Sequence, residues 1–393
     1  MSTATTARGL GALRLANRER LLAALREHGD VSRAELARLT ALSGTTVSSL
    51  VTELADAGLV VEGGDDRTSG RRGRPGRLVR AVRDRRLVVA MDLSLDVVRA
   101  AVCDADGAVL AEVGEAPALA GPDDDGSAAL AHAAGLVERL LAADGVDRRR
   151  VEQLVAAVPG VVDPTNGAVV SDRRPRWREL DLGQELERAT GLPTRLENDA
   201  DLCALGERAF GAARGLDDVV LVKASTGIGV GLVLAGRLYR GAHGGVGELG
   251  HVQVSEPGDL CVCGNRGCLE TVAASGPVIA ALQVVHPHVR THEDVAALVA
   301  AGDRGAVRAV TDAGTAIGKT VADLCNVLAP QAVVVGGDLA AGGDHLTRAV
   351  RDAVERSTKP RTAGRLALLT GELGHRAALL GAVVAADAAH APS

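Results

Sequence analysis

The run Gly247-Glu248-Leu249-Gly250-His251, followed closely by Cys261-Val262-Cys263-Gly264-Asn265-Arg266-Gly267-Cys268-Leu269-Glu270, is the most informative stretch of this chain. It places one histidine and three cysteines within eighteen residues. Sulfur and imidazole ligands in a set of four are typical of structural zinc, because four protein ligands leave no open position for a catalytic water. The sequence therefore predicts a structural zinc site formed by His251, Cys261, Cys263 and Cys268.

The competing interpretation of these cysteines is a disulfide pair with a spare thiol, or scattered free thiols. A chain of 393 residues can bury a large core and needs no disulfide to hold it. The sequence has no signal-peptide core and no long apolar span, so we expect a cytoplasmic protein in a reducing compartment. The remaining cysteines stand alone among apolar residues and are predicted to be small buried side chains: Cys103, Cys203 and Cys325.

Charge is divided unevenly along the chain. Residues 1–86 carry a formal charge of +6 and the rest carry −12. This asymmetry is typical of a basic nucleic-acid-binding module joined to an acidic one. The chain has only one Phe, one Trp and one Tyr, which argues against binding of single-stranded nucleic acid by base stacking. We expect a flexible tail at 1–13, a DNA-binding domain at 14–86 and a larger domain at 87–393.

Residues 18–58 are patterned as three short helices. Leucines recur at helical spacing between 18 and 27, Ser32-Arg33-Ala34-Glu35 reads as a capping box, and a turn at 41–43 precedes the third helix. This succession predicts a helix-turn-helix, whose last helix enters the major groove of DNA. The alternative is an ordinary three-helix bundle with a polar face. The candidates for contacts with phosphates and base edges are Thr45, Thr46, Ser48 and Ser49.

The segment after the third helix is predicted to be a wing. Residues 59–62 and 77–80 read as paired strands, and the loop between them is rich in glycine and arginine. From residue 67 to residue 86, nine arginines face one acid. The alternative is a solvated charge run. Because an extended cationic loop suits a minor groove of negative potential, we expect salt-sensitive DNA contacts from Arg72, Arg74 and Arg77.

The larger domain contains one pattern twice. Two strands, a turn and a third strand are predicted between residues 87 and 112, and the same succession is predicted between 219 and 239. Helical stretches follow each meander, which predicts a duplicated α/β architecture with a cleft between two lobes. Further strands end at Pro159-Gly160, Asn198-Asp199 and Gly336-Gly337, and such strand ends are where open α/β sheets bind ligands.

Together these motifs resemble the ROK family of repressors, open reading frames and sugar kinases, in its repressor branch. The resemblance covers nearly the whole chain. It implies a winged helix-turn-helix followed by a two-lobed ribonuclease-H/actin-like sugar kinase fold, with a zinc loop at 248–270. It is carried by Gly247-Glu248-Leu249-Gly250-His251, the cysteine loop with Glu270, Glu197-Asn198-Asp199-Ala200, and Ser225-Thr226-Gly227-Ile228-Gly229.

The resemblance also implies a hexose-like sugar surrounded by Asn198, Asp199, Glu248, His251 and Glu270. Carboxylates accept strong hydrogen bonds from hydroxyls, and His251 would bind zinc through one ring nitrogen and turn the other toward the sugar. Glu248 and Glu270 stay open to interpretation as surface acids or acids behind the site, and Asn198 as a turn residue. Asp199 resembles the general base of family kinases, so it is the catalytic candidate if kinase activity is retained.

The phosphate-binding side departs from the kinase pattern. Family kinases open with Asp-x-Gly-x-Thr, whereas this chain has Asp92-Leu93-Ser94-Leu95-Asp96. The loop loses a glycine and a hydroxyl that favour phosphate binding, and Asp96 adds negative charge. These changes argue against ATP binding. If ATP binds, the residues expected to contact it are Asp92, Thr226, Gly227, Gly229, Gly336 and Gly337.

The leading hypothesis is a sugar-responsive transcriptional regulator, a repressor that binds a double-stranded operator as a homodimer or dimer of dimers. A monosaccharide or its phosphate would favour one closure of the lobes and change how two winged domains fit their half-sites. One alternative is an ATP-dependent, glucokinase-like kinase with an accessory DNA-binding domain. Another is an activator, or a regulator that answers to a partner protein.

Overall fold

In a computed structural model, the chain forms two compact units, Met1–Arg85 and Arg86–Ser393. The structure describes residues 14, 17–18, 20–22, 24–25, 28–56, 59–65, 77–81, 86–94, 97–116, 127–171, 177 and 180–388. The predicted tail at 1–13 and the wing residues Arg72 and Arg74 lie outside the described residues. Within the described ranges, no helix combines the length and the apolar character that crossing a membrane requires.

The helices of the first unit follow the predicted pattern. Helix α2 (Arg33–Thr40) begins after Ser32, whose hydroxyl accepts a hydrogen bond from the Glu35 amide at 3.4 Å. Helix α3 (Gly44–Asp56) buries one aliphatic face. That face packs against Leu21 and Leu25, which occupy described helical positions ahead of α2. An aliphatic core therefore holds the predicted helix-turn-helix together.

The sheet of the first unit has one strand more than the sequence pattern predicts. Strands β2 (Val60–Asp65) and β3 (Arg77–Ala81) pair antiparallel as expected for a wing. Strand β1 (Val31–Ser32) also pairs antiparallel with β3, which makes a three-stranded sheet. A two-residue strand is too short to show the alternation on which strand prediction depends.

The first lobe of the second unit is a five-stranded sheet in the order β10-β7-β4-β5-β6. The first three strands in the chain form an antiparallel meander, and the last two add in parallel on the other side of β4. These strands are β4 (Leu87–Leu93), β5 (Val98–Asp104), β6 (Val109–Glu115), β7 (Val151–Val158) and β10 (Thr194–Asn198).

The second lobe repeats this order as β15-β14-β11-β12-β13. Its meander and its two parallel strands pair in the same way as those of the first lobe. The strands are β11 (Val219–Ala224), β12 (Ile228–Leu234), β13 (Arg237–Leu238), β14 (Ala332–Gly336) and β15 (Ala367–Thr370). The predicted duplication is therefore confirmed at the level of strand topology.

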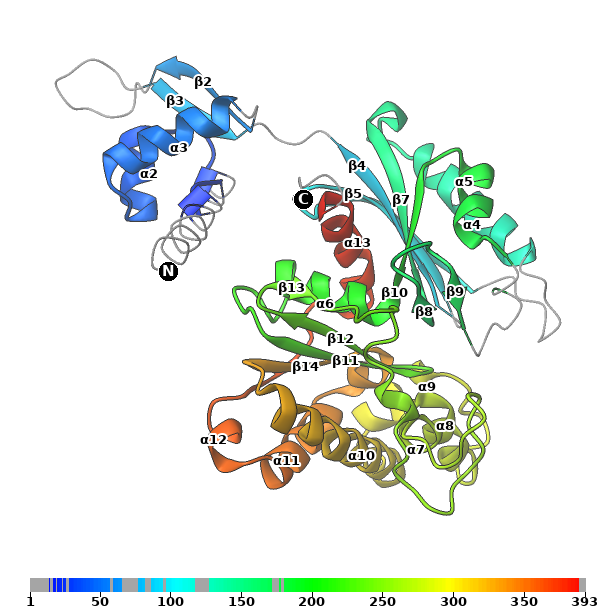
Figure 1. Cartoon of the computed structure of the whole chain (residues 1–393). Coiled ribbons are helices and arrows are strands. Elements are labelled where there is room, and N and C mark those ends of the chain that lie inside the picture. The colour runs from blue at the N-terminus through cyan, green and yellow to red at the C-terminus, as the bar shows by residue number, and fades with distance from the viewer. Residues whose placement is uncertain are drawn as a thin grey trace. The chain divides into compact units, whose positions relative to one another are not determined.

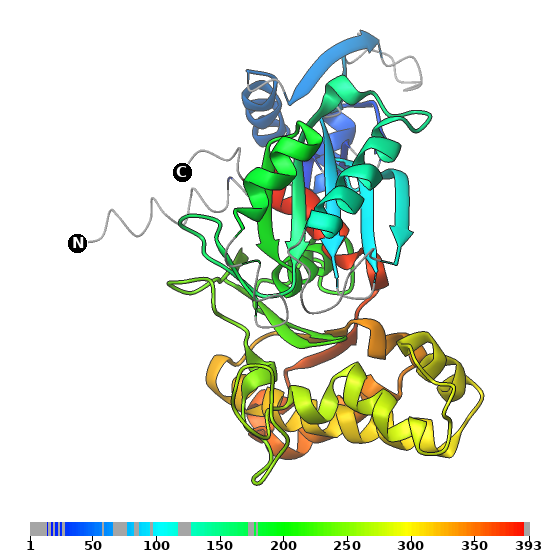
Figure 2. The ribbon, with the colours of Figure 1, turned by 90° about the vertical axis from the view of Figure 1, so that its right-hand side faces the viewer.

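Helices cover both faces of each sheet. Helices α6 (Asp199–Phe210) and α13 (Ala377–Ala388) lie between the sheets and share a core with both (Figure 1). Helices α4 (Ser127–Leu141) and α5 (Leu182–Thr190) pack on the outer face of the first sheet. The outer face of the second sheet is covered by the layer below it in Figure 2, which contains α8 (Ser275–Gln283), α9 (His292–Ala300), α10 (Arg304–Leu328) and α11 (His345–Ser357).

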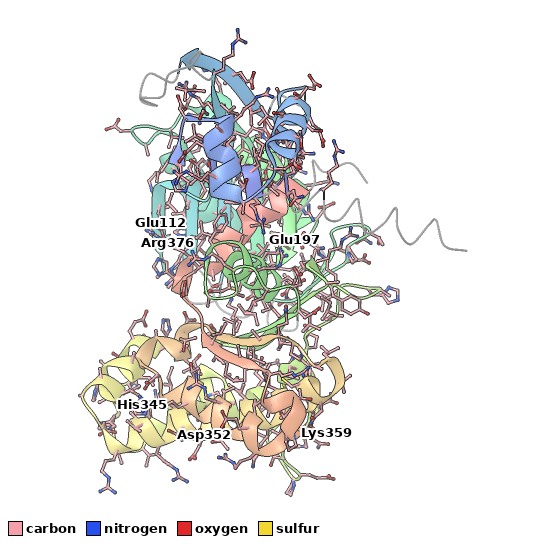
Figure 3. The ribbon with its side chains drawn as sticks, turned by 90° about the vertical axis from the view of Figure 1, so that its left-hand side faces the viewer. Glu112, Glu197, His345, Asp352, Lys359 and Arg376 are labelled. Atoms are coloured by element: carbon pink, nitrogen blue, oxygen red, sulfur yellow. The ribbon has the colours of Figure 1, made fainter. Side chains whose placement is uncertain are left out.

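Shorter elements connect these layers. They are the hairpin β8 (Val161–Val162) and β9 (Val169–Val170), helices α7 (Glu270–Ala273) and α12 (Pro360–Ala363), and the 3₁₀ helices η1 (Arg148–Arg150), η3 (Leu249–His251), η4 (Asp338–Gly342) and η5 (Gly374–Arg376). One connection ties β6 to the segment before α13: Arg376 Nε donates to Glu112 Oε2 at 2.8 Å, and Figure 3 labels both residues.

Glycines allow α6 and α13 to approach each other closely. A Cβ atom at Gly206 would lie 2.2 Å from the carbonyl oxygen of Ala377, and one at Gly381 would lie 1.8 Å from that of Leu202. Because no side chain fits at these distances, glycine sets the spacing of the two helices. This close contact anchors the layer that separates the two sheets.

Candidate functional site

A pocket of about 150 Å³ lies where strand ends of the two lobes meet. The first lobe contributes the turn after β7 and the junction of β10 with α6, and the second contributes the turn from Ser225 to Gly229. The segment around η3 and the start of α7 complete the lining. All five residues predicted to surround a sugar line this one pocket: Asn198, Asp199, Glu248, His251 and Glu270.

Asn198 has the turn role that the sequence leaves open. Its Oδ1 accepts hydrogen bonds from the amides of Ala200 and Asp201 at 2.9 and 3.0 Å, which caps α6. Its Nδ2 donates to the carbonyl of Gly160 at 2.9 Å, which ties the ends of β10 and β7 together. Asn198 therefore builds the pocket wall as well as lining it.

Asp199 is paired with a lysine that sequence analysis misses. Lys223 Nζ lies 2.5 Å from Asp199 Oδ2, and the two side chains are only 14% and 16% exposed. Asp199 Oδ1 accepts from the amide of Ala200 at 2.8 Å. The available signal is a lysine near the end of the apolar run of β11, two residues before Ser225-Thr226-Gly227.

The surroundings keep Lys223 charged. Burial by itself lowers the pKa of Lys223, but attraction to Asp199 and Asp92 outweighs burial and moves its pKa upward. Burial raises the pKa of Asp92, while Lys223 opposes that shift. The pocket lining therefore holds a buried cation that is ion-paired with Asp199 and attracted by Asp92.

The four predicted metal ligands form one cluster. Their donor atoms all lie within 4.8 Å of one another. The sulfurs of Cys263 and Cys268 are 3.8 Å apart, and all six cysteines are free thiols, so the disulfide interpretation is wrong. Tetrahedral coordination at a metal–sulfur distance of about 2.3 Å places two sulfurs about 3.8 Å apart. The cluster therefore fits a tetrahedral metal ion.

The donor set and its orientation support a metal in this cluster. Burial raises the pKa of the Cys268 thiol to about 12, so the thiolate forms there only when a coordinated dication displaces the proton. His251 Nδ1 lies 3.5 Å from the sulfur of Cys261, whereas its Nε2 lies 3.5 Å from Glu248 Oε2. One ring nitrogen thus faces the cluster and the other faces a residue of the pocket.

The other three cysteines confirm their prediction as buried side chains, since Cys103, Cys203 and Cys325 are all buried. Burial raises the pKa of Cys103 to about 12 and that of Cys325 to about 11. They lie in β5, α6 and α10, apart from the metal cluster.

The residues considered for ATP are divided between two cavities. Thr226, Gly227 and Gly229 line the first pocket. Asp92, Gly336 and Gly337 line an adjoining cavity of about 280 Å³, and Lys223 lines both.

Local geometry accounts for two of these residues without a nucleotide. Ser94 Oγ donates to Asp92 Oδ1 at 2.7 Å, so the serine in the glycine position folds back onto the acid. Gly337 has a φ of 92°, and a Cβ atom there would lie 2.4 Å from the carbonyl of Ala224. Packing of β14 against β11 therefore explains this glycine. Leu95 and Asp96 lie outside the described residues.

The candidate DNA-contacting face lies on α3. Thr45 and Ser49 are exposed and Thr46 and Ser48 are half-buried. Ser43 Oγ accepts from the Thr46 amide at 3.1 Å, and it lies within hydrogen-bonding distance of both threonine hydroxyls. Arg77 is exposed at the start of β3, opposite Asp65 of β2.

The chain joins a winged helix-turn-helix to a duplicated α/β unit that has a cleft at its strand ends. This combination defines a class of protein that includes both regulators and sugar kinases. Residues 88–389 match the ROK family, and residues 20–72 match the MarR family. The chain belongs to the ROK family, and its fold is the predicted winged helix-turn-helix followed by an actin-like sugar kinase fold.

Relatives of two kinds share this fold. The xylose repressor of Bacillus spizizenii is 28% identical over 93% of this chain and 93% of its own length. A glucokinase of Halalkalibacterium halodurans is 34% identical, over 57% of this chain and 72% of the enzyme. The crystal structure of a ROK transcriptional regulator, a homologue of the E. coli Mlc protein, covers 96% of both chains with a TM-score of 0.73 and 29% identity.

Proposed function

We propose that this protein is a sugar-responsive transcriptional repressor that binds operator DNA with its first unit and a monosaccharide in the cleft of its second. The observation that carries the proposal is the winged helix-turn-helix fused to the sugar-kinase fold. Repressor relatives match this arrangement from end to end, whereas the glucokinase match extends over only 57% of the chain. This proposal also places the protein in the cytoplasm, together with the DNA that it would bind.

The pocket chemistry supports sugar binding. Glu248 and Glu270 bring carboxylate oxygens to one wall, and Asp199 faces the same space. Although Lys223 and the Ala200 amide occupy one position on each oxygen of Asp199, a carboxylate has about four acceptor positions. Asp199 therefore keeps capacity to accept from sugar hydroxyls.

The metal in the cluster is, in this proposal, a structural zinc ion held by His251, Cys261, Cys263 and Cys268. It supplies a fixed centre that orients the His251 ring, while Nε2 of that ring stays directed toward Glu248 and the sugar. The position of the bound sugar and the conformation of the metal-binding loop are then coupled through the His251 imidazole.

The same geometry argues that the cleft does not transfer phosphate. The candidate base, Asp199, is ion-paired with Lys223, and the loop at Asp92 has a serine in place of the glycine that approaches phosphate. The protein is proposed to act as a homodimer, in which a tenfold change in operator affinity requires only about 1.4 kcal/mol of coupling between sugar and DNA sites.

The Glu248→Gln variant tests the function. Purified protein is expected to leave a labelled operator fragment as sugar is added, and the variant should need about 10- to 100-fold more sugar, because a hydrogen bond to a charged acceptor is worth about 1.5–3 kcal/mol. Operator affinity without sugar should stay unchanged. Fluorescence anisotropy with xylose and glucose measures both quantities.

Glu256→Gln is the matched control, since Glu256 is an exposed acid of the same loop that does not line the pocket. It should respond like the wild type. A Glu248→Gln protein with a normal sugar response would exclude Glu248 from sugar binding.

The Arg74→Ala variant tests the wing. The slope of log K against log salt is expected to fall by about 0.9, because one phosphate contact is lost. The measurement is operator binding across a salt series. Arg149→Ala, a change of an exposed arginine in the second unit, should leave the slope as it is. An identical slope in both variants would count against the wing contact.

A further inference from the structure

Lys223 is a buried cation in a pocket whose carboxylate and amide side chains suit sugar hydroxyl groups. It is one of three lysines among 44 basic residues of an arginine-rich chain. A lysine ammonium is a compact point charge, whereas arginine carries a broad planar fork. The position therefore uses the compact basic residue, which pairs with Asp199 and is also attracted by Asp92.

The backbone around Lys223 explains how its side chain reaches the cleft. Lys223 lies on the central strand β11, and its partners on the two neighbouring strands are Gly229 and Gly336. Neither partner has a side chain that could crowd it. Lys223 lines both the sugar pocket and the adjoining cavity, so it lies where the two spaces meet.

The remaining charges of the pocket are unfavourable for an anion. Its lining contains four carboxylates, Asp199, Glu248, Glu270 and Asp338, and two cations, Lys223 and Arg99. With both histidines counted as neutral, the formal charge is −2. Arg99 is the cross-strand partner of Asp92 and is electrostatically coupled to it. Both cations of the lining therefore already face acids of the protein.

We propose that Lys223 is a specificity-determining residue, an internal counter-ion of Asp199 that thereby restricts the effector to uncharged sugars, excluding sugar phosphates. A phosphate group needs a cation that is free to pair with it. Here the ammonium is engaged by Asp199 at 2.5 Å, and the nearby acids repel a dianion. This inference rests on the proposed function in that it places a sugar in the cleft.

The test compares the full-length wild type with Asp199→Asn and with the double variant Asp199→Asn/Lys223→Met. The probes are xylose, glucose, glucose 6-phosphate and inorganic phosphate. Their binding is measured by isothermal titration calorimetry and by thermal unfolding. In the wild type, each phosphate-bearing probe should bind at least tenfold more weakly than the better of the two neutral sugars.

Asp199→Asn removes the partner of Lys223 while preserving the shape of the side chain. It should bind inorganic phosphate and glucose 6-phosphate at least tenfold more tightly than the wild type does. The double variant also lacks the negative charge of Asp199 but has no ammonium, so it should show no such gain. It leaves neither member of the ion pair buried without a partner, which makes it the matched control for folding.

Two results would overturn the inference. The first is a wild type that binds glucose 6-phosphate at least as tightly as either neutral sugar, which would leave a sugar-responsive repressor intact. The second is an equal gain of phosphate binding in the single and double variants. By contrast, operator binding that no sugar and no sugar phosphate changes would refute the proposed function, while the phosphate comparison between variants still tests Lys223.

Discussion

Replacing Cys263 with serine is expected to strip the bound metal from the purified protein and to loosen the loop between His251 and Cys268. Loss of a residue that hydrogen-bonds a metal ligand already lowers the affinity for the metal by about 10- to 100-fold. Loss of a thiolate that binds the metal directly lowers this affinity further. The loop has little apolar burial to replace the metal, because Leu260 and Val262 are exposed. Metal analysis by mass spectrometry and limited proteolysis within the loop measure the two effects.

The sugar response should weaken in the same variant. His251 faces the cluster with Nδ1 and Glu248 with Nε2, so a loop that loses its metal also loses the orientation of the imidazole. Cys325→Ala is the control: this cysteine is fully buried in α10, away from the cluster. It should lower stability slightly and keep one equivalent of zinc. A Cys263→Ser protein that also keeps a full equivalent would exclude Cys263 from the ligand set.

Replacing Glu207 with alanine is expected to destabilise the second unit by about 3–5 kcal/mol. Glu207 is 2% exposed at the end of α6. Its carboxylate accepts from the amide of Ala212 at 2.8 Å and from the amides of Glu372 and Leu373 at 3.1 and 2.9 Å. Each buried amide left without an acceptor costs about 1–3 kcal/mol.

Differential scanning calorimetry of the full chain should show the transition of the second unit lowered by roughly 5–10 °C. Glu355→Ala, a change of an exposed glutamate on α11, should change the stability by no more than about 0.5 kcal/mol. If the two variants melt at the same temperature, the carboxylate of Glu207 does not hold these amides as inferred.

Features formed within short stretches of chain were predictable. The histidine and three cysteines of the candidate metal cluster fall within eighteen residues, the Ser32 cap spans three, and each meander consists of neighbouring strands. Closing such short loops has a small entropic cost, so spacing and residue type are sufficient to predict the partners. The five residues assigned to the sugar were placed by motif resemblance, and they line one pocket.

Features that join distant segments were not predictable. Strand β1 pairs with β3, Asn198 bonds the carbonyl of Gly160, and Glu207 bonds amides about 165 residues away. Each of these contacts depends on the order of strands and the packing of layers, which no local pattern encodes.

Lys223 shows most clearly the difference between what can be predicted from the sequence and what depends on tertiary packing. Residue type and periodicity are enough to specify two meanders, a clustered set of one histidine and three cysteines, and a basic end with a helix-turn-helix. They give no indication that a lysine on β11 meets an aspartate at the start of α6. That pairing arises because the two lobes bring their strand ends to a common edge, where a buried charge must find a partner of opposite sign. The electrostatic character of the cleft, and with it the effector choice that we propose, is therefore set by tertiary structure.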